Sequence, residues 1–272
     1  PPNARRGPVV TKDDIKRGLR ELGLLRGDVV GVHSSLRSFG HVEGGADAVI
    51  DALLETVGEE GAVVMPTHST NLEKVERTPE EIALGMSWKF RILPFDPQET
   101  PCTTGVIPET FRKRTGAVRS VHPSLSLTAM GKNAGALCQG WDKVLEADGY
   151  VLLIGVGLDR CTAMHLAERR VRFPERILKM ITPPKEIVER YPSDEWEWDF
   201  GRYPDFAKLE PLCRERGIMR TTVVGAATLR LLKLKDLVAL YAEALVANPD
   251  LFYGGRETGA GTAPDERNGA GV

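Results

Sequence analysis

Two short apolar runs with an amphipathic segment between them limit the fold of this chain more than any other feature of its sequence. The runs are VVGVH (29–33) and AVVMP (62–66), and each is bounded by polar or turn-forming residues. The segment between them (44–58) carries apolar residues at three- and four-residue spacing and closes on Gly58, which is typical of a helix. Two buried strands joined by a helix form a βαβ unit, so the sequence predicts an α/β fold.

Other segments carry comparable signals and place more helices and strands along the chain. The predicted elements are a helix over 11–23 with Thr11 as its N-cap, a helix near 105–114 with Pro108 in its first turn, a strand over 150–158, a helix over 162–171, a strand near 221–224 and a long amphipathic helix ending near Ala247. Residues 71–101 have few periodic apolar positions, so we expect a long irregular excursion over one face. Residues 253–272 are rich in Gly, Ala and charge, which predicts one domain over 1–252 followed by a mobile tail.

Composition excludes several classes of protein. A chain of 272 residues is long enough to bury a core without disulfides or a structural metal. Its 36 Lys and Arg against 38 Asp and Glu argue against a nucleic-acid protein that relies on bulk charge. No apolar run approaches the roughly 20 residues of a membrane helix, and PPNARRGP lacks the apolar core of a secretory signal. We therefore expect a cytoplasmic monomer or homodimer without membrane or nucleic-acid partners.

The cysteines give no sign of a metal site or a redox motif. Cys102, Cys138, Cys161 and Cys213 are widely spaced, and none belongs to a CxxC pair. We interpret all four as small buried hydrophobes.

His165 is the most informative of the five histidines, because it lies three residues before Glu168 on a predicted helix. This spacing puts both side chains on one helical face, where the carboxylate can fix the imidazole tautomer and favour a general base. One alternative is that His165 and Glu168 form an ordinary i,i+3 surface pair. Another is that Glu168 forms a salt bridge with an arginine at 169, 170 or 172. The helix has no second histidine, so no metal site is predicted.

Two polar segments suit the binding of a ligand. HSSL (33–36) follows the first strand, and its hydroxyls and backbone N–H groups can contact amides or phosphates. RSVHPSLS (119–126) offers the Arg119 guanidinium for a phosphate, beside Ser120 and His122. The serines of HSSL do not form a GxSxG elbow, and the chain lacks the Rossmann and P-loop motifs.

Residues 185–205 are locally acidic, with Trp196 and Trp198 among seven acidic residues. Such a segment suits a polycationic ligand. The alternative is a solvated loop with its tryptophans folded inward.

Taken together, these segments resemble the aminoglycoside 3-N-acetyltransferase family, also called the antibiotic N-acetyltransferase family. The matching stretches, in the family's order, are 29–67, FDPQETP (95–101), RSVHPSLSLTAMG (119–131), LLIGVGLDRCTAMHLAE (152–168) and, more weakly, VVGAATLRLL (223–232). The resemblance implies acetyl-CoA as donor, the 3-amino group of a 2-deoxystreptamine aminoglycoside as acceptor, and hence a role in antibiotic resistance. It also implies a single α/β domain with a central mixed β-sheet flanked by helices, distinct from the GNAT fold.

The resemblance also assigns roles to single residues. His165 matches the family's histidine, interpreted as the base for the attacking amine, Glu168 matches the glutamate beside it, and Thr162 matches a hydroxyl residue for the oxyanion. The positions implied to face CoA are His33, Ser34, Ser35, Thr104, Gly105, Arg119, Ser120 and His122. The chain departs from the family pattern at Thr104, where many members have Met, at Ala62, where Thr is common, and over 71–94.

A polycationic acceptor needs carboxylates around it. The candidate acceptor-binding residues are Thr67, His68, Asp96, Glu99, Glu189, Asp194 and Glu195. Direct attack in a ternary complex needs only positioning, so we do not expect Cys161 to carry the acetyl group. The alternatives are an acetyltransferase for another amine and a non-catalytic CoA-binding protein, and the presence of both His165 and Glu168 disfavours the latter.

Overall fold

The computed structural model describes residues 9–69 and 71–254, which build a large and a small β-sheet with helices around them. Within the described residues the main sheet contains seven strands in the order β5-β6-β2-β1-β7-β10-β9. Their bounds are β1 (Val29–Ser34), β2 (Ala62–Pro66), β5 (Val118–Arg119), β6 (Leu127–Gly131), β7 (Tyr150–Ile154), β9 (Met219–Val224) and β10 (Ala227–Lys233). Strand β1 runs parallel to β2 and β7, whereas the outer strands join antiparallel. The predicted βαβ unit and mixed sheet are confirmed.

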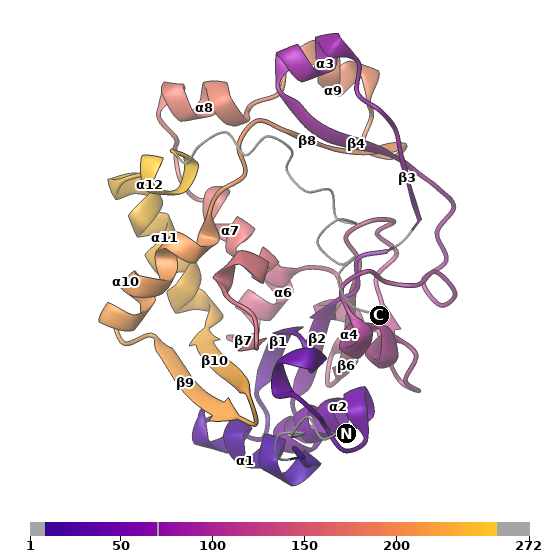
Figure 1. The fold of residues 1–272 in the computed structure, drawn as a ribbon, viewed down its shortest axis with the longest axis vertical. Coiled ribbons are helices and arrows are strands. Elements are labelled where there is room, and N and C mark those ends of the chain that lie inside the picture. Colours follow the sequence, from indigo (N-terminus) through magenta and orange to yellow (C-terminus); the bar gives the residue numbers. More distant parts are fainter. Residues whose placement is uncertain (1–8, 70, 255–272) are drawn as a thin grey trace, which may run out of the picture.

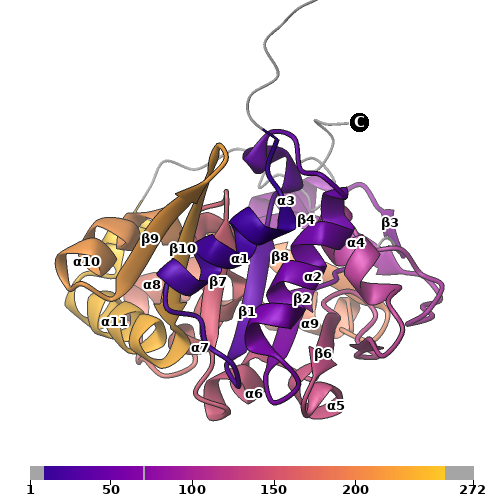
Figure 2. The ribbon, with the colours of Figure 1, turned by 90° about the horizontal axis from the view of Figure 1, so that it is seen from below.

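Helices cover both faces of the main sheet because its central strands are buried on both sides. Leu152 belongs to the apolar cluster of one face, and its neighbour Leu153 belongs to that of the other. The first face packs against α1 (Lys12–Glu21), α2 (Gly45–Val57) and α4 (Val106–Arg112), and Figure 2 shows α1 and α2 in front of the sheet. The second face packs against α5 (Ala134–Leu137), α6 (Trp141–Glu146), α7 (His165–Glu168) and α11 (Leu234–Ala247).

Helices α1 and α2 begin and end close to where the sequence predicts, and local interactions at their ends explain why. The Thr11 hydroxyl accepts the backbone N–H of Asp14 at 3.2 Å, and the Asp14 carboxylate accepts the N–H of Thr11 at 2.9 Å, which completes a capping box. Helix α2 ends at Gly58, whose φ of 65° lies in the region that favours glycine.

A small second sheet corrects the prediction that 71–101 is irregular. Its strands are β3 (Leu72–Lys74), β4 (Met86–Ile92) and β8 (Trp196–Phe200), accompanied by α3 (Pro79–Leu84) and α9 (Lys185–Arg190). The alternative of a loop over 185–205 is wrong for the same reason, but its inward-folded tryptophans are confirmed, because Trp196 and Trp198 pack against a small buried cluster. Figure 1 shows this sheet with α3 and α9 at the opposite end of the molecule from α1 and α2.

Two other predictions need correction, and three strands of the main sheet were not predicted. The strand predicted over 150–158 ends at Ile154, because Gly155 turns the chain with a φ of 64°. The helix predicted over 162–171 is a 3₁₀ turn (Thr162–Met164) followed by α7. The long C-terminal helix starts only at Leu234, because 227–233 pairs as β10 with β9. Strands β5 and β6 were not predicted.

The remaining elements are short connections. They are the 3₁₀ turns η1 (Leu36–Phe39), η2 (Leu158–Arg160) and η4 (Phe206–Leu209), and the helices α8 (Glu175–Ile181), α10 (Glu210–Glu215) and α12 (Asp250–Tyr253). Residues 255–272 of the predicted tail lie outside the described residues. In the ranges that the structure covers, no helix is both long enough and apolar enough to span a bilayer.

Candidate active site

A cleft of about 1140 Å³ opens where β1, β2 and β7 end. Its walls come from the residues that follow these strands, from the loop after β5, and from β4 and β8 of the small sheet. The carboxyl ends of parallel strands are where α/β folds commonly bind ligands. The cleft therefore joins the two sheets into one candidate site.

His165 and Glu168 form a hydrogen-bonded pair at this cleft. His165 Nδ1 lies 3.0 Å from Oε2 of Glu168, and His165 lines the cleft. The buried Tyr241 donates its hydroxyl to the other Glu168 oxygen at 3.4 Å. Among the ion pairs of the described residues Glu168 pairs with His165 and with none of the neighbouring arginines. The pair expected from i,i+3 spacing is thus present, and it fixes the orientation of the ring.

The second nitrogen of His165 faces a residue that the sequence analysis missed. Nε2 lies 2.5 Å from the hydroxyl of Tyr203, which also lines the cleft and is 49% exposed. Tyr203 lies 38 positions along the chain from His165, and no local motif joins the two.

His33 and Ser34 bring two unsatisfied polar atoms to the end of β1. The Nε2 of His33 and the Oγ of Ser34 are buried without a hydrogen-bond partner among the described residues, and both residues line the cleft. Burial, with the nearby charge of His68, lowers the pKa of His33 to about 3, so its ring is neutral at pH 7. Unpaired buried polar atoms are costly, so these two are well placed to contact a ligand.

Several other residues predicted to bind CoA also lie in the cleft. Ser35, Thr104, Gly105, Ser120 and His122 all line it. The backbone N–H of Leu125 donates to Nδ1 of His122 at 3.0 Å, which places the ring hydrogen of neutral His122 on Nε2.

Arg119, in contrast, is not brought into the cleft. Its guanidinium donates to the carbonyl oxygens of Thr67 at 2.7 Å, Thr100 at 2.5 Å and Pro97 at 3.3 Å, and to Ser126 Oγ at 3.0 Å. These bonds bind the segment around Pro97 and Thr100 to the ends of β2 and β6. The side chain is therefore committed to protein carbonyls rather than to a phosphate.

The carboxylates predicted around the acceptor also lie elsewhere. Asp96 accepts the backbone N–H groups of Gln98 at 2.7 Å and Glu99 at 3.0 Å within its own turn. Glu189 pairs with Lys185 at 3.1 Å on α9. Of the predicted acceptor residues only His68 lines the cleft; the others, which do not, are Thr67, Asp96, Glu99, Glu189, Asp194 and Glu195.

Two other carboxylates, those of Glu197 and Asp199, line the cleft instead of the predicted ones. They lie two residues apart on β8, on the same face of the strand, and both line the cleft beside Trp88 of β4. The hydroxyl of Ser124 donates to Glu197 at 2.6 Å and so links the small sheet to the loop after β5. The strict alternation in EWEWDF (195–200) is the sequence signal that would have revealed this strand.

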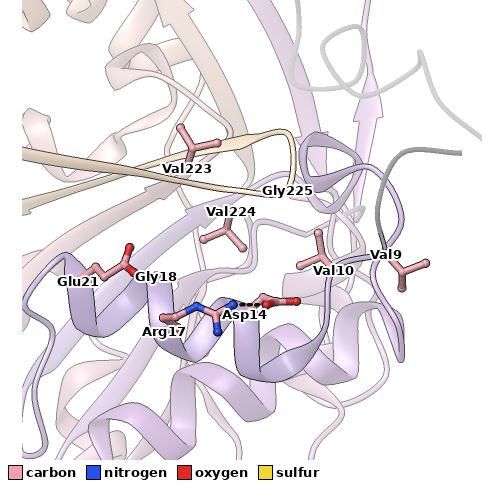
Figure 3. A pocket seen from close by; sticks show the side chains of 9 residues that line it. All are labelled: Val9, Val10, Asp14, Arg17, Gly18, Glu21, Val223, Val224 and Gly225. Carbon is pink, nitrogen blue, oxygen red and sulfur yellow. Dashed lines mark hydrogen bonds and ion pairs between the residues drawn. The ribbon is translucent and has the colours of Figure 1, made fainter.

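A second, smaller pocket of about 280 Å³ lies between α1 and the β9–β10 hairpin (Figure 3). Its acidic side chains are already paired: Asp14 with Arg17, and Glu21 with the hydroxyl of Thr222. No group of three or more His, Cys, Asp or Glu side chains in 9–69 or 71–254 is arranged to hold a metal ion.

The family model described as aminoglycoside 3-N-acetyltransferase matches residues 32–246, a span that includes the residues lining the larger cleft. The chain belongs to this family. The SPbeta prophage-derived aminoglycoside N(3')-acetyltransferase-like protein YokD of Bacillus subtilis is 32% identical over 88% of this chain and 93% of its own length. The family assignment made from the sequence is confirmed.

Solved structures of aminoglycoside acetyltransferases have the same fold. A mutant of AAC(3)-IVa in complex with gentamicin superposes with a TM-score of 0.72 at 25% identity, covering 96% of this chain and 97% of that chain. AAC-IIIb in a binary complex with CoASH gives a TM-score of 0.69 at 25% identity, covering 89% of this chain and 98% of that chain. The predicted single mixed-sheet α/β fold is confirmed, with the small sheet as an addition to the prediction.

Proposed function

We propose that this protein transfers the acetyl group of acetyl-CoA to the 3-amino group of a 2-deoxystreptamine aminoglycoside. Family membership supports this reaction, as do the solved relatives with CoASH or gentamicin bound. The observation that carries the proposal is the His165–Glu168 pair, which lines a cleft of about 1140 Å³. This volume is at the upper end of known ligand sites, as expected where two substrates must meet.

His165 is the proposed general base. An ammonium group cannot attack a thioester, so a base must take a proton from the amine nitrogen before or during attack. Glu168 holds the Nδ1–H of His165 and stabilises the imidazolium that forms, which leaves Nε2 to receive the proton. The incoming amine takes the position of the Tyr203 hydroxyl, and Tyr203 is half exposed, so its displacement disturbs little of the core.

The donor side of the cleft fits the chemistry of acetyl-CoA. When bound, acetyl-CoA supplies the acetyl group as an activated thioester. His33 Nε2 and Ser34 Oγ are the unsatisfied buried groups that suit the amides of its pantetheine arm. Thr162 also lines the cleft, and its hydroxyl would donate to the oxygen that becomes negative during attack.

Direct transfer, without an acetylated enzyme, is favoured by the state of Cys161. This thiol is fully buried, and burial raises its pKa to about 12. Because the thiolate is the nucleophile, a thiol held protonated and away from the cleft is unsuited to carry the acetyl group.

The first prediction tests the proposed base with acetyl-CoA and a panel of aminoglycosides with and without a free 3-amino group. Thiol release should require that amine, and His165→Ala should lower kcat by roughly 10²- to 10⁴-fold, the usual effect of losing a general base. Glu168→Gln should lower kcat less, because glutamine preserves a hydrogen bond to the ring.

Four outcomes would contradict parts of the proposal. A His165→Ala variant that keeps more than about half the wild-type kcat would remove the histidine as base. A larger loss from Glu168→Gln would move that role to the carboxylate. CoA binding without thiol release would identify a non-catalytic binding protein, whereas release with amines of another class would change the acceptor.

A further inference from the structure

Trp141 forms part of the cleft wall and is held on three sides. Its indole N–H donates to the Thr162 hydroxyl at 3.0 Å. Its ring stacks on His33, with ring centroids 5.3 Å apart and an interplanar angle of 28°. The six-membered ring also covers Gly31, where an added Cβ would lie 2.4 Å from Cζ3 of Trp141.

The contact at Gly31 explains a glycine in the middle of a buried strand. Glycine inside a strand usually weakens the strand, by roughly 0.5–1 kcal/mol relative to alanine. Gly31 pairs with both β2 and β7, and its φ is not in the left-handed region, so the backbone does not require it. Glycine is needed here because any larger residue would clash with the Trp141 ring, so the sequence leaves room for this ring against β1.

The hydrogen bond from Trp141 decides what the Thr162 hydroxyl can do. An indole N–H only donates, whereas a hydroxyl donates once and accepts with two lone pairs. Thr162 Oγ1 is therefore the acceptor here, and the hydrogen bonds of the described residues give the Thr162 hydroxyl no second partner. Since Thr162 lines the cleft, its hydrogen is available to a ligand there.

We infer that Trp141 is a positioning residue, which orients Thr162 so that this hydroxyl donates to the oxygen of the acetyl group during attack. The inference rests on the proposed function, which makes Thr162 the donor to that oxygen. The indole holds Oγ1 by one lone pair and turns the O–H away from itself and toward the cleft. Accepting one hydrogen bond also makes a hydroxyl a stronger donor of the next.

The second prediction concerns five variants compared at saturating substrate: Thr162→Val, Trp141→Phe, Thr162→Ser and the two double variants that combine Trp141→Phe with a Thr162 substitution. Thr162→Val should lower kcat by about 10²- to 10³-fold, as the loss of one oxyanion donor does. Trp141→Phe keeps the ring over Gly31 and His33 but removes the N–H. It should lower kcat by about 2- to 10-fold, the usual worth of one hydrogen bond, with little change in either KM. In the Thr162→Val background Trp141→Phe should have no further effect, whereas in Thr162→Ser, which restores the hydroxyl, its effect should return.

Trp198→Phe is the matched control, because it removes an indole N–H bond of 2.8 Å to the Tyr191 carbonyl that does not involve Thr162. In the double variant with Thr162→Val, the factors by which the two substitutions lower kcat should multiply. Gly31→Ala, which crowds Trp141 without altering its chemistry, should lower kcat in the wild type but not in Thr162→Val. Thermal unfolding of every variant identifies those that fold as the wild type does.

The outcomes separate the inference from the function on which it rests. If Trp141→Phe slows Thr162→Val as much as the wild type, or leaves the wild-type kcat unchanged, the inference is wrong and the proposed function stands. If Thr162→Val keeps the wild-type kcat, the oxyanion role of Thr162 fails and the inference fails with it. If the wild type acetylates no amine, both are overturned.

Discussion

At the residue scale, His33 shows how burial, more than any neighbouring charge, sets the charge of a side chain beside the cleft. The ring is 5% exposed and stacks on Trp141, and its Nε2 has no hydrogen-bond partner among the described residues. Burial first, and the charge of His68 second, lower the pKa of His33 to about 3. The ring is therefore a neutral hydrogen-bonding group at pH 7, and the base that we propose is His165 instead.

The third prediction follows from this pKa and concerns stability. A histidine in an unfolded chain titrates near pH 6.5, so between about pH 6.5 and 3 the unfolded chain binds a proton that folded His33 does not. The free energy of unfolding should therefore fall as the pH falls through this window, by about 1.4 kcal/mol per pH unit for this one group. His68, whose pKa burial and the charges of His122 and Arg119 lower to about 4, acts in the same direction.

Urea unfolding between pH 6.5 and 5, above the range in which most carboxylates titrate, measures this slope. The His33→Gln variant should lose about 1.4 kcal/mol per pH unit of the wild-type dependence. His41→Gln, a substitution at an exposed histidine, should keep the full dependence. Equal slopes in the wild type and in His33→Gln would show that folding does not lower the pKa of this ring.

At the element scale, a buried polar cluster holds the small sheet together. Lys89 of β4 pairs with Glu81 of α3 at 2.7 Å and donates to the Tyr191 hydroxyl at 3.1 Å, and Tyr191 in turn donates to Glu81. Burial by itself raises the pKa of Glu81, but hydrogen bonds from Lys89 and Tyr191 outweigh it and lower that pKa to about 2. The cluster binds α3, β4 and the end of α9 into one unit.

The fourth prediction is that breaking this pair affects the acceptor more than the donor. Lys89→Met leaves the Glu81 charge buried without a cation, which costs about 3–5 kcal/mol. Because β4 pairs with β8, which carries Glu197 and Asp199, the KM for an aminoglycoside should rise while the KM for acetyl-CoA changes little. Replacing both Glu81 and Lys89 by Met should restore most of the stability, because no unpaired charge remains. If Lys89→Met raises both KM values alike, the small sheet is not specific to the acceptor.

The small sheet also shows where prediction from the sequence stops. The βαβ unit from 29 to 66 was predictable because its apolar runs, the spacing of apolar residues in its helix and Gly58 are all local signals. Strands β4 and β8 do alternate apolar and polar residues, but they pair across more than 100 residues, and no local signal names the partner. In ATLRLLK (227–233) the alternating pattern of a strand runs directly into the apolar pattern of the helix that follows. The β9–β10 hairpin was therefore not predicted.

In the candidate site, too, some residues could be predicted from the sequence and others could not. His165 and Glu168 lie on one short helix, so their spacing was sufficient to find them, whereas Thr162, in the turn before it, was found through the family resemblance. The sequence analysis chose Asp194 and Glu195, whereas Glu197 and Asp199 line the cleft, because the face of a strand that meets the cleft depends on tertiary packing. Arg119 donates to backbone carbonyls of residues that are distant in sequence, and no side-chain motif predicts such partners.

At the scale of the whole molecule, both sheets contribute side chains to the wall of the cleft. The main sheet and the segments after its strands present His33, Ser34, Thr162 and His165. The small sheet presents Glu197 and Asp199, and the Ser124–Glu197 hydrogen bond of 2.6 Å connects the two parts. The chain as a whole has a net charge of only -2, so the attraction that we propose for a polycationic acceptor depends on where its carboxylates lie.

The fifth prediction uses salt to locate those carboxylates. The Debye length shrinks from about 30 Å at 0.01 M to about 8 Å at 0.15 M ionic strength, so the KM for a tetra- or penta-cationic aminoglycoside should rise steeply over this range. The KM for acetyl-CoA should not follow it. In the double variant Glu197→Gln, Asp199→Asn the acceptor KM should already be high at low salt and should depend on salt much less. Glutamine can still accept the hydrogen bond from Ser124, so the contact between the two parts is kept.

The matched control is the double variant Asp194→Asn, Glu195→Gln, which changes the net charge by the same two units just before the same strand. Neither of these residues lines the cleft. If local carboxylates attract the acceptor, the control keeps the steep wild-type dependence while the Glu197, Asp199 variant loses it. If both variants flatten the dependence equally, the attraction comes from the overall charge of the molecule, and β8 is not the acceptor wall. If neither does, the ammonium groups of the acceptor meet other carboxylates of the cleft, of which Asp142 and Asp159 are the next to test.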